Sequence, residues 1–226
     1  MDRHDEPLRT DTLALFRAPG EFIDSDHPAI AEQAARLMIG TGGADVAGAR
    51  AIYYYVRDLH YEGDDFDNVE IYRASSVLAA VGGYCVSKAS LFTALARAAG
   101  IPARIAFADV RNHLASRRLL AAMGTDTFAW HGFAEVHLLG RWVKVSPTFD
   151  PITCRRVGVA PLEFDGHHDA LLQSFDGERS MDYVKFHGSF HDVPARFLAT
   201  EMLRLYPFAR DRGISRFNAQ RHLDER

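Results

Sequence analysis

The chain has 226 residues, of which 47% are hydrophobic and 25% charged, and its formal net charge is −4. These fractions exclude a largely disordered or collagen-like chain, and the length favours a single domain over 1–226. The chain has no excess of basic residues of the kind that nucleic-acid binding needs. No apolar run reaches the ~20 residues of a membrane span. Because the N-terminus is too polar to begin a secretory signal, we expect a cytoplasmic protein without nucleic-acid or membrane partners.

The first part of the chain is predicted to be helical. Asp26 or Ser25 is a suitable N-cap, and Pro28 fits the first turn because its missing N–H costs nothing there. Further along, Ser75 or Ser76 is expected to cap a short helical turn that ends at a pair of glycines. The predicted elements here are helices over 28–39, 45–59 and 75–81, with an acidic loop over 60–74.

The clearest element is a helix over 85–99, rich in the strong helix formers Ala and Leu. Gly100 fits its C-terminal cap, and Pro102 forbids its continuation. The helix is apolar on nearly all sides, which is typical of a helix at the centre of a fold.

The second half of the chain has the patterns of strands. Two strands joined at Leu139-Gly140 predict a hairpin. Because helices precede an antiparallel hairpin, the order is typical of an α+β fold. The predicted elements are a strand over 103–110, a helix over 114–123, strands over 130–138 and 141–146, an irregular stretch over 151–192, and a last helix over 193–205.

Of the two cysteines, Cys85 stands at the first turn of the 85–99 helix. Unsatisfied N–H groups and a partial positive charge at that end favour the thiolate, which is the nucleophilic form. The N–H of Cys85 could also serve as an oxyanion donor in acyl transfer. The alternative is that Cys85 is a small buried hydrophobe. Cys154 has no comparable helix signal and is expected to be structural.

A histidine opens the first strand of the hairpin. Pairing through the Leu139-Gly140 turn places His131 opposite Thr148, which makes His131 and Ser146 diagonal neighbours on one face. A general base beside a thiolate needs a third group to orient its imidazole, and Ser146 is placed for that task.

Four blocks of sequence resemble the transglutaminase-like superfamily, whose core is related to papain-type thiol enzymes. They are GYCVSKA at 83–89, AAGIPAR at 98–104, HGFAEV at 131–136 and GRWVKVSPT at 140–148. The resemblance implies a papain-like α+β core over 45–155 with N- and C-terminal extensions, in which an antiparallel sheet packs on the central helix. It also implies that Cys85 is the nucleophile and His131 the base.

The third catalytic position departs from the family pattern, which usually has Asp immediately before Pro-Thr, where this chain has Ser146. A carboxylate is not obligatory, because papain-like enzymes use an amide at this position. Asp150 lies four residues further on, between two prolines, and is a second candidate for orienting His131.

Further residues are candidates for the walls of a cleft. Tyr84 and Trp130 could line an acyl pocket or belong to the core. Asn112 could donate to an oxyanion, orient His131 or cap the next helix. Glu135 faces Lys144 in the predicted hairpin, which favours a cross-strand salt bridge over a catalytic carboxylate. Four further histidines and two neighbouring aspartates lack a known metal-ligand spacing, so no metal or cofactor is expected. They are His167, His168, Asp169, His187, His191 and Asp192.

The favoured function is cysteine-dependent acyl transfer, of the transglutaminase, protease or amidohydrolase type. The substrate would be a peptide, amide or other acyl compound, with an amine as a possible acceptor. The alternative is a non-catalytic binding or scaffold domain that retains the fold. A metal hydrolase built on the histidines is a weaker third hypothesis.

Overall fold

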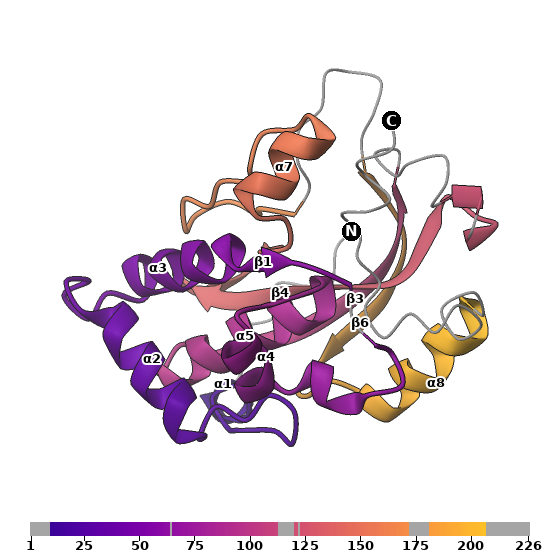
Figure 1. Ribbon diagram of the computed structural model, residues 1–226. Coiled ribbons are helices and arrows are strands. Elements are labelled where there is room, and N and C mark those ends of the chain that lie inside the picture. The colour runs from indigo at the N-terminus through magenta and orange to yellow at the C-terminus, as the bar shows by residue number, and fades with distance from the viewer. Residues whose placement is uncertain (1–9, 64, 113–119, 122, 172–180, 207–226) are drawn as a thin grey trace, which may run out of the picture.

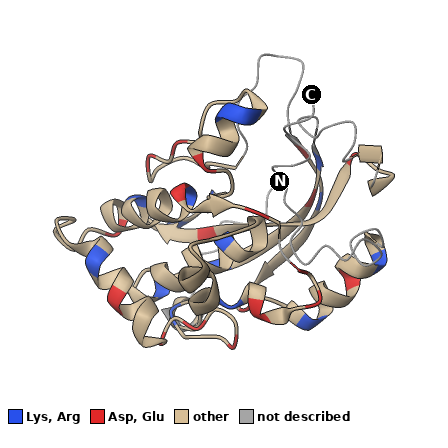
Figure 2. Ribbon diagram, in the orientation of Figure 1, with Lys and Arg blue, Asp and Glu red and all other residues tan. Residues whose placement is uncertain are grey.

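The computed structural model describes residues 10–63, 65–112, 120–121, 123–171 and 181–206. A four-stranded antiparallel sheet packs against helices, and Figure 1 shows α2, α3, α4 and α5 gathered on one side of it. The fold is α+β, as predicted. Among the described residues, no helix combines the length and apolarity that crossing a bilayer requires. Basic and acidic positions are interspersed along the helices (Figure 2), as the near-balance of 26 and 30 such residues implies.

The predicted N-terminal helices agree with α2, α3 and α4 to within one or two residues, but their caps differ, and α1 was not predicted. His27, rather than Asp26 or Ser25, caps α2 by accepting from the N–H of Ala29. Ser75 lies inside α4, and its N–H and hydroxyl both donate to Asp24. The elements of this region are α1 (Thr10–Leu15), α2 (Pro28–Met38), α3 (Asp45–Asp58), β1 (His60–Tyr61), η1 (Val69–Tyr72), α4 (Ala74–Ala80) and β2 (Gly82–Gly83).

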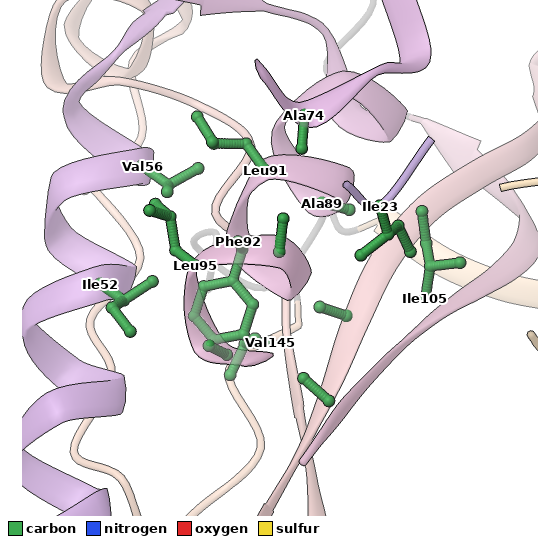
Figure 3. Packing of buried hydrophobic residues seen from close by; sticks show 14 of the residues in the cluster. Ile23, Ile52, Val56, Ala74, Ala89, Leu91, Phe92, Leu95, Ile105 and Val145 are labelled. Atoms are coloured by element: carbon green, nitrogen blue, oxygen red, sulfur yellow. The ribbon is translucent and has the colours of Figure 1, made fainter. Parts of the chain in front are cut away.

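Helix α5 (Cys85–Ala98) is the centre of the core, as its apolar surface predicts. Every residue from Val86 to Arg97 is buried. Figure 3 shows Ile52 and Val56 of α3 directed toward Leu95 of α5, and all three belong to one hydrophobic cluster. Because full burial of such a side chain contributes about 1.5–3 kcal/mol, these contacts hold α5 firmly against α3.

The sheet has the order β5-β4-β3-β6, with all neighbours antiparallel. The hairpin between β4 and β5 has the predicted register, which pairs Glu135 with Lys144. Leu139 and Gly140 have φ values of 51° and 81°, as a two-residue turn of the left-handed kind requires. The strands are β3 (Ala103–Asn112), β4 (Thr127–Leu138), β5 (Arg141–Val145) and β6 (Met181–Phe190).

The prediction of an irregular stretch over 151–192 is wrong, because this stretch contains α7 (Pro151–Val157) and the edge strand β6. Asp150 caps α7 and proline occupies its first turn, which is a readable start signal. Two register shifts between β3 and β6 break the regular alternation by which strands are recognised. The last helix, α8 (Ala195–Leu205), was predicted, and the helix expected over 114–123 falls mostly outside the described residues.

Candidate active site

The site begins at the first residue of α5, where Cys85 is half-buried and Cys154 on α7 is fully buried. Neither cysteine forms a disulfide. Tyr84 occupies the N-cap position in an extended conformation and provides no side-chain cap. The positive end of the helix dipole therefore acts on the region of the Cys85 thiol without a capping carboxylate to offset it.

The start of α5 contacts the part of β4 that is not paired with β5. The β4–β5 pairing stops at Ala134 and Val145, so the part of β4 before Ala134 has no β5 partner. At this place the backbones almost touch: a Cβ added to Gly132 would lie 2.8 Å from the Cα of Val86. Only glycine permits so close an approach. Cys85 and His131 each precede one of these two residues in the chain.

His131 is buried, with 7% of its surface exposed, and its Nε2 lies 3.4 Å from the Oγ of Ser146. The Ser146 hydroxyl lies 2.9 Å from the Oγ1 of Thr148. The hairpin register predicts this position of Ser146 diagonally across from His131. Burial lowers the pKa of His131 to about 4, so its imidazole is neutral near pH 7. A hydroxyl at this position supplies no negative charge that would oppose the effect of burial.

Asp150 does not approach His131 and instead holds two segments of backbone together. Its carboxylate accepts from the N–H groups of Tyr61, Ile152 and Thr153 and from the Thr153 hydroxyl, at 2.7–3.0 Å. Burial by itself raises the pKa of Asp150, but these hydrogen bonds outweigh it and hold the pKa below its usual value. The hypothesis that Asp150 curls back to orient His131 is therefore corrected: it caps α7.

Lys88, one turn after Cys85, is fully buried and was missed by the sequence analysis. Its Nζ donates to the carbonyl oxygens of Arg57, Leu59 and Thr148 at 3.0, 2.8 and 2.7 Å. Three acceptors match the three N–H bonds of an ammonium group. Burial lowers the pKa of Lys88 to about 7, and the charge of Asp150 partly opposes this. Lys88 thus ties α5 to the segment that carries Thr148, the hydrogen-bond partner of Ser146.

Trp130, directly before His131, has a strained backbone with φ of 58°. The Oδ1 of Asp109 accepts from the Trp130 N–H at 3.1 Å and lies 2.6 Å from the Nε2 of His187. The His187 ring stacks on the Trp130 ring at 3.9 Å with an interplanar angle of 11°. Strain of this kind persists only where surrounding contacts determine it, so these contacts fix the backbone that carries His131.

The other candidates have different positions. Tyr84 is buried in an aromatic cluster with Phe66 and Tyr72, at 5.5 and 6.2 Å. Asn112 is the last residue of β3, and its side chain lies outside the described part of the chain. Glu135 faces Lys144, but the predicted salt bridge to Lys144 is wrong: the Glu135 carboxylate pairs with Arg104 at 2.5 Å.

The histidines considered as metal ligands have separate partners. His168 pairs with Asp165, and the carbonyl of His191 accepts from Arg97. In the described part of the chain, no three His, Cys, Asp or Glu side chains are grouped so that they could hold a metal ion.

Comparison with known proteins identifies the family. Residues 32–147 match the model of the transglutaminase-like superfamily core. The match spans just over half of the chain, and the protein belongs to this superfamily, whose members are usually cysteine enzymes.

Among solved structures, a Cytophaga hutchinsonii protein provisionally named a cysteine protease is similar, with 21% identity and a TM-score of 0.46. The match covers 64% of this chain and 45% of that one, so the chain spans less than half of that protein's length. A search of curated proteins found no match.

Proposed function

We propose that the protein is a cysteine-dependent acyl-transfer enzyme that cleaves an amide or thioester through a thioester on Cys85. The observation that supports this proposal is the close contact between Gly132 and Val86, the residues that follow His131 and Cys85 in the chain. Membership of a superfamily of cysteine enzymes supports it.

The chemistry follows from the two ring nitrogens of His131. Because Nε2 faces the Ser146 hydroxyl, Nδ1 is the nitrogen left to accept the thiol proton. The Cys85 sulfur attacks the carbonyl carbon, and the electron pair of the C=O bond moves to oxygen. The N–H of Cys85 donates to that oxyanion. Collapse breaks the bond to the leaving amine or thiol, which takes the proton from His131, and water or an amine then resolves the thioester.

With Ser146 in place of a carboxylate, this residue places no negative charge beside His131 in the proposed site. The imidazolium formed during the reaction has a hydroxyl at Nε2, which can accept its hydrogen bond but does not neutralise its charge. Together with the pKa of about 4, this means that the resting site holds a neutral imidazole rather than an imidazolium paired with a thiolate. We therefore infer that the proton moves to His131 only as the sulfur attacks.

Alkylation by iodoacetamide as a function of pH tests the proposal, with the labelled cysteine identified by peptide mass spectrometry. We expect Cys85 to react near neutral pH with a midpoint below the ~8.5 of a free thiol, because the helix dipole favours the thiolate. Cys85→Ala should abolish this reaction, whereas the matched variant Cys154→Ala should leave it unchanged. A midpoint at or above ~8.5, with no acylation by p-nitrophenyl acetate, would contradict the proposal and favour a non-catalytic binding domain.

A further inference from the structure

Tyr183 on β6 has a hydroxyl oxygen that is buried and has no hydrogen-bond partner among the described residues. A buried polar group without a partner costs about 1–3 kcal/mol, so folded proteins rarely retain one without a reason. The mechanism above does not use this residue, and the sequence analysis did not single it out.

The Tyr183 ring lies on the same face of the sheet as His131. Its centroid is 5.7 Å from that of Phe133 in a T-shaped contact, and Phe133 follows His131 by two residues on β4. Side chains two apart on a strand point to the same face. In the strand between them, Val110 pairs with Tyr183 and Ala108 pairs with His131. Ala108 and Phe133 belong to one small buried cluster, and Tyr183 packs against it.

The thiol of Cys85 interacts electrostatically with the same phenol. Burial raises the pKa of Tyr183, and the charge of Cys85 raises it further. Electrostatic coupling of this kind requires the two groups to be close. The phenol therefore remains protonated at physiological pH and keeps its O–H available as a hydrogen-bond donor.

We propose that Tyr183 is a catalytic residue whose O–H donates a hydrogen bond to the acyl oxygen of a substrate on Cys85. It would act as a second oxyanion donor beside the N–H of Cys85, and the inference rests on the proposed function. When the carbon–sulfur bond forms, the electron pair of the C=O bond moves to oxygen. Tyr183 stabilises this oxyanion without giving up its proton, and the thiol proton goes to His131. The pair returns to reform C=O as the leaving group departs.

Tyr183→Phe tests the proposal because it removes one oxygen and no hydrogen bond to any residue that the structure describes. The thermal midpoint should stay the same or rise, since the unpartnered hydroxyl is gone. The acylation rate with p-nitrophenyl acetate should fall by about 100-fold or more, the effect of losing one oxyanion donor. Alkylation of Cys85 by iodoacetamide forms no oxyanion, so its rate should change by less than about twofold.

Tyr54→Phe is the matched control, because the Tyr54 hydroxyl donates to Glu163 and to the carbonyl of Phe164, neither of which has a role in this chemistry. It should lower the thermal midpoint and leave acylation unchanged. An acylation rate of Tyr183→Phe equal to that of the wild type overturns the inference, as does an equal fall in acylation and alkylation. Failure of the wild type to acylate, with Cys85 unreactive toward iodoacetamide, overturns the proposed function itself.

Discussion

Replacing Ser146 by Asp restores the carboxylate that the family pattern usually has beside the histidine. At the 3.4 Å that separates Ser146 Oγ from His131 Nε2, a carboxylate and an imidazolium attract each other by about 5 kcal/mol at an effective dielectric constant of ~20. Since about 1.4 kcal/mol corresponds to one pKa unit, the full attraction would raise the pKa of His131 by about 3.5. Burying the new carboxylate offsets part of it, although the Thr148 hydroxyl, now 2.9 Å from Ser146 Oγ, can donate to it. We expect the pKa to rise from about 4 to about 6.

A more basic His131 stabilises the thiolate of Cys85 as an ion pair. In Ser146→Asp, the midpoint of Cys85 alkylation by iodoacetamide should therefore move to lower pH by at least about one pH unit. Ser146→Asn is the matched control, because it has nearly the same size and no charge, and its midpoint should stay close to that of the wild type. If folded Ser146→Asp shows an unchanged or higher midpoint, the imidazole is not coupled to the thiol and the reasoning is refuted.

Three further predictions concern the support of the site. Lys88→Met leaves three buried carbonyls without a donor, so the free energy of unfolding in urea should fall by about 3 kcal/mol, whereas an unchanged value would mean that water replaces the ammonium. Asp109→Ala removes the carboxylate that accepts from the Trp130 N–H and fixes that backbone. The rate of Cys85 alkylation should fall by roughly tenfold with little loss of secondary structure. A rate equal to that of the wild type would show that this contact does not position the imidazole of His131. Because the pKa of His131 is depressed in the folded state, lowering the pH protonates this histidine in the unfolded chain before it does so in the folded protein. The free energy of unfolding should therefore fall by up to about 3 kcal/mol as the pH falls from about 6.5 to about 4. The variant His131→Gln should show a smaller fall over the same range.

Local sequence signals predicted the elements that depend on local chemistry. The bounds of α5 follow from its composition and from Gly100 and Pro102, and the β4–β5 register follows from a two-residue turn, so the contact between His131 and Ser146 was predictable. Strand β6 was not predicted, because its bulges break the alternation of apolar residues and its partner β3 lies about 80 residues earlier in the chain.

The supporting residues of the site could not be predicted, because their roles depend on contacts between distant segments. Lys88 looks like an isolated charge in an apolar helix until three carbonyls from two other segments surround it. Asp150 was close enough in sequence to be a candidate partner of His131, but the start of α7 and the N–H of Tyr61 use its carboxylate. The left-handed backbone of Trp130 carries no signal in the sequence, since nothing local favours that conformation for tryptophan.

The most direct test of the central claim is to trap the acyl-enzyme. The protein is mixed with p-nitrophenyl acetate, quenched in acid within the first turnover and digested for peptide mass spectrometry. The account predicts one acetyl group on the peptide that contains Cys85, none on the peptide that contains Cys154, and a much slower appearance of the adduct in His131→Ala. An acetyl group that appears on Cys85 equally fast without His131, or no adduct on Cys85 at all, would contradict it.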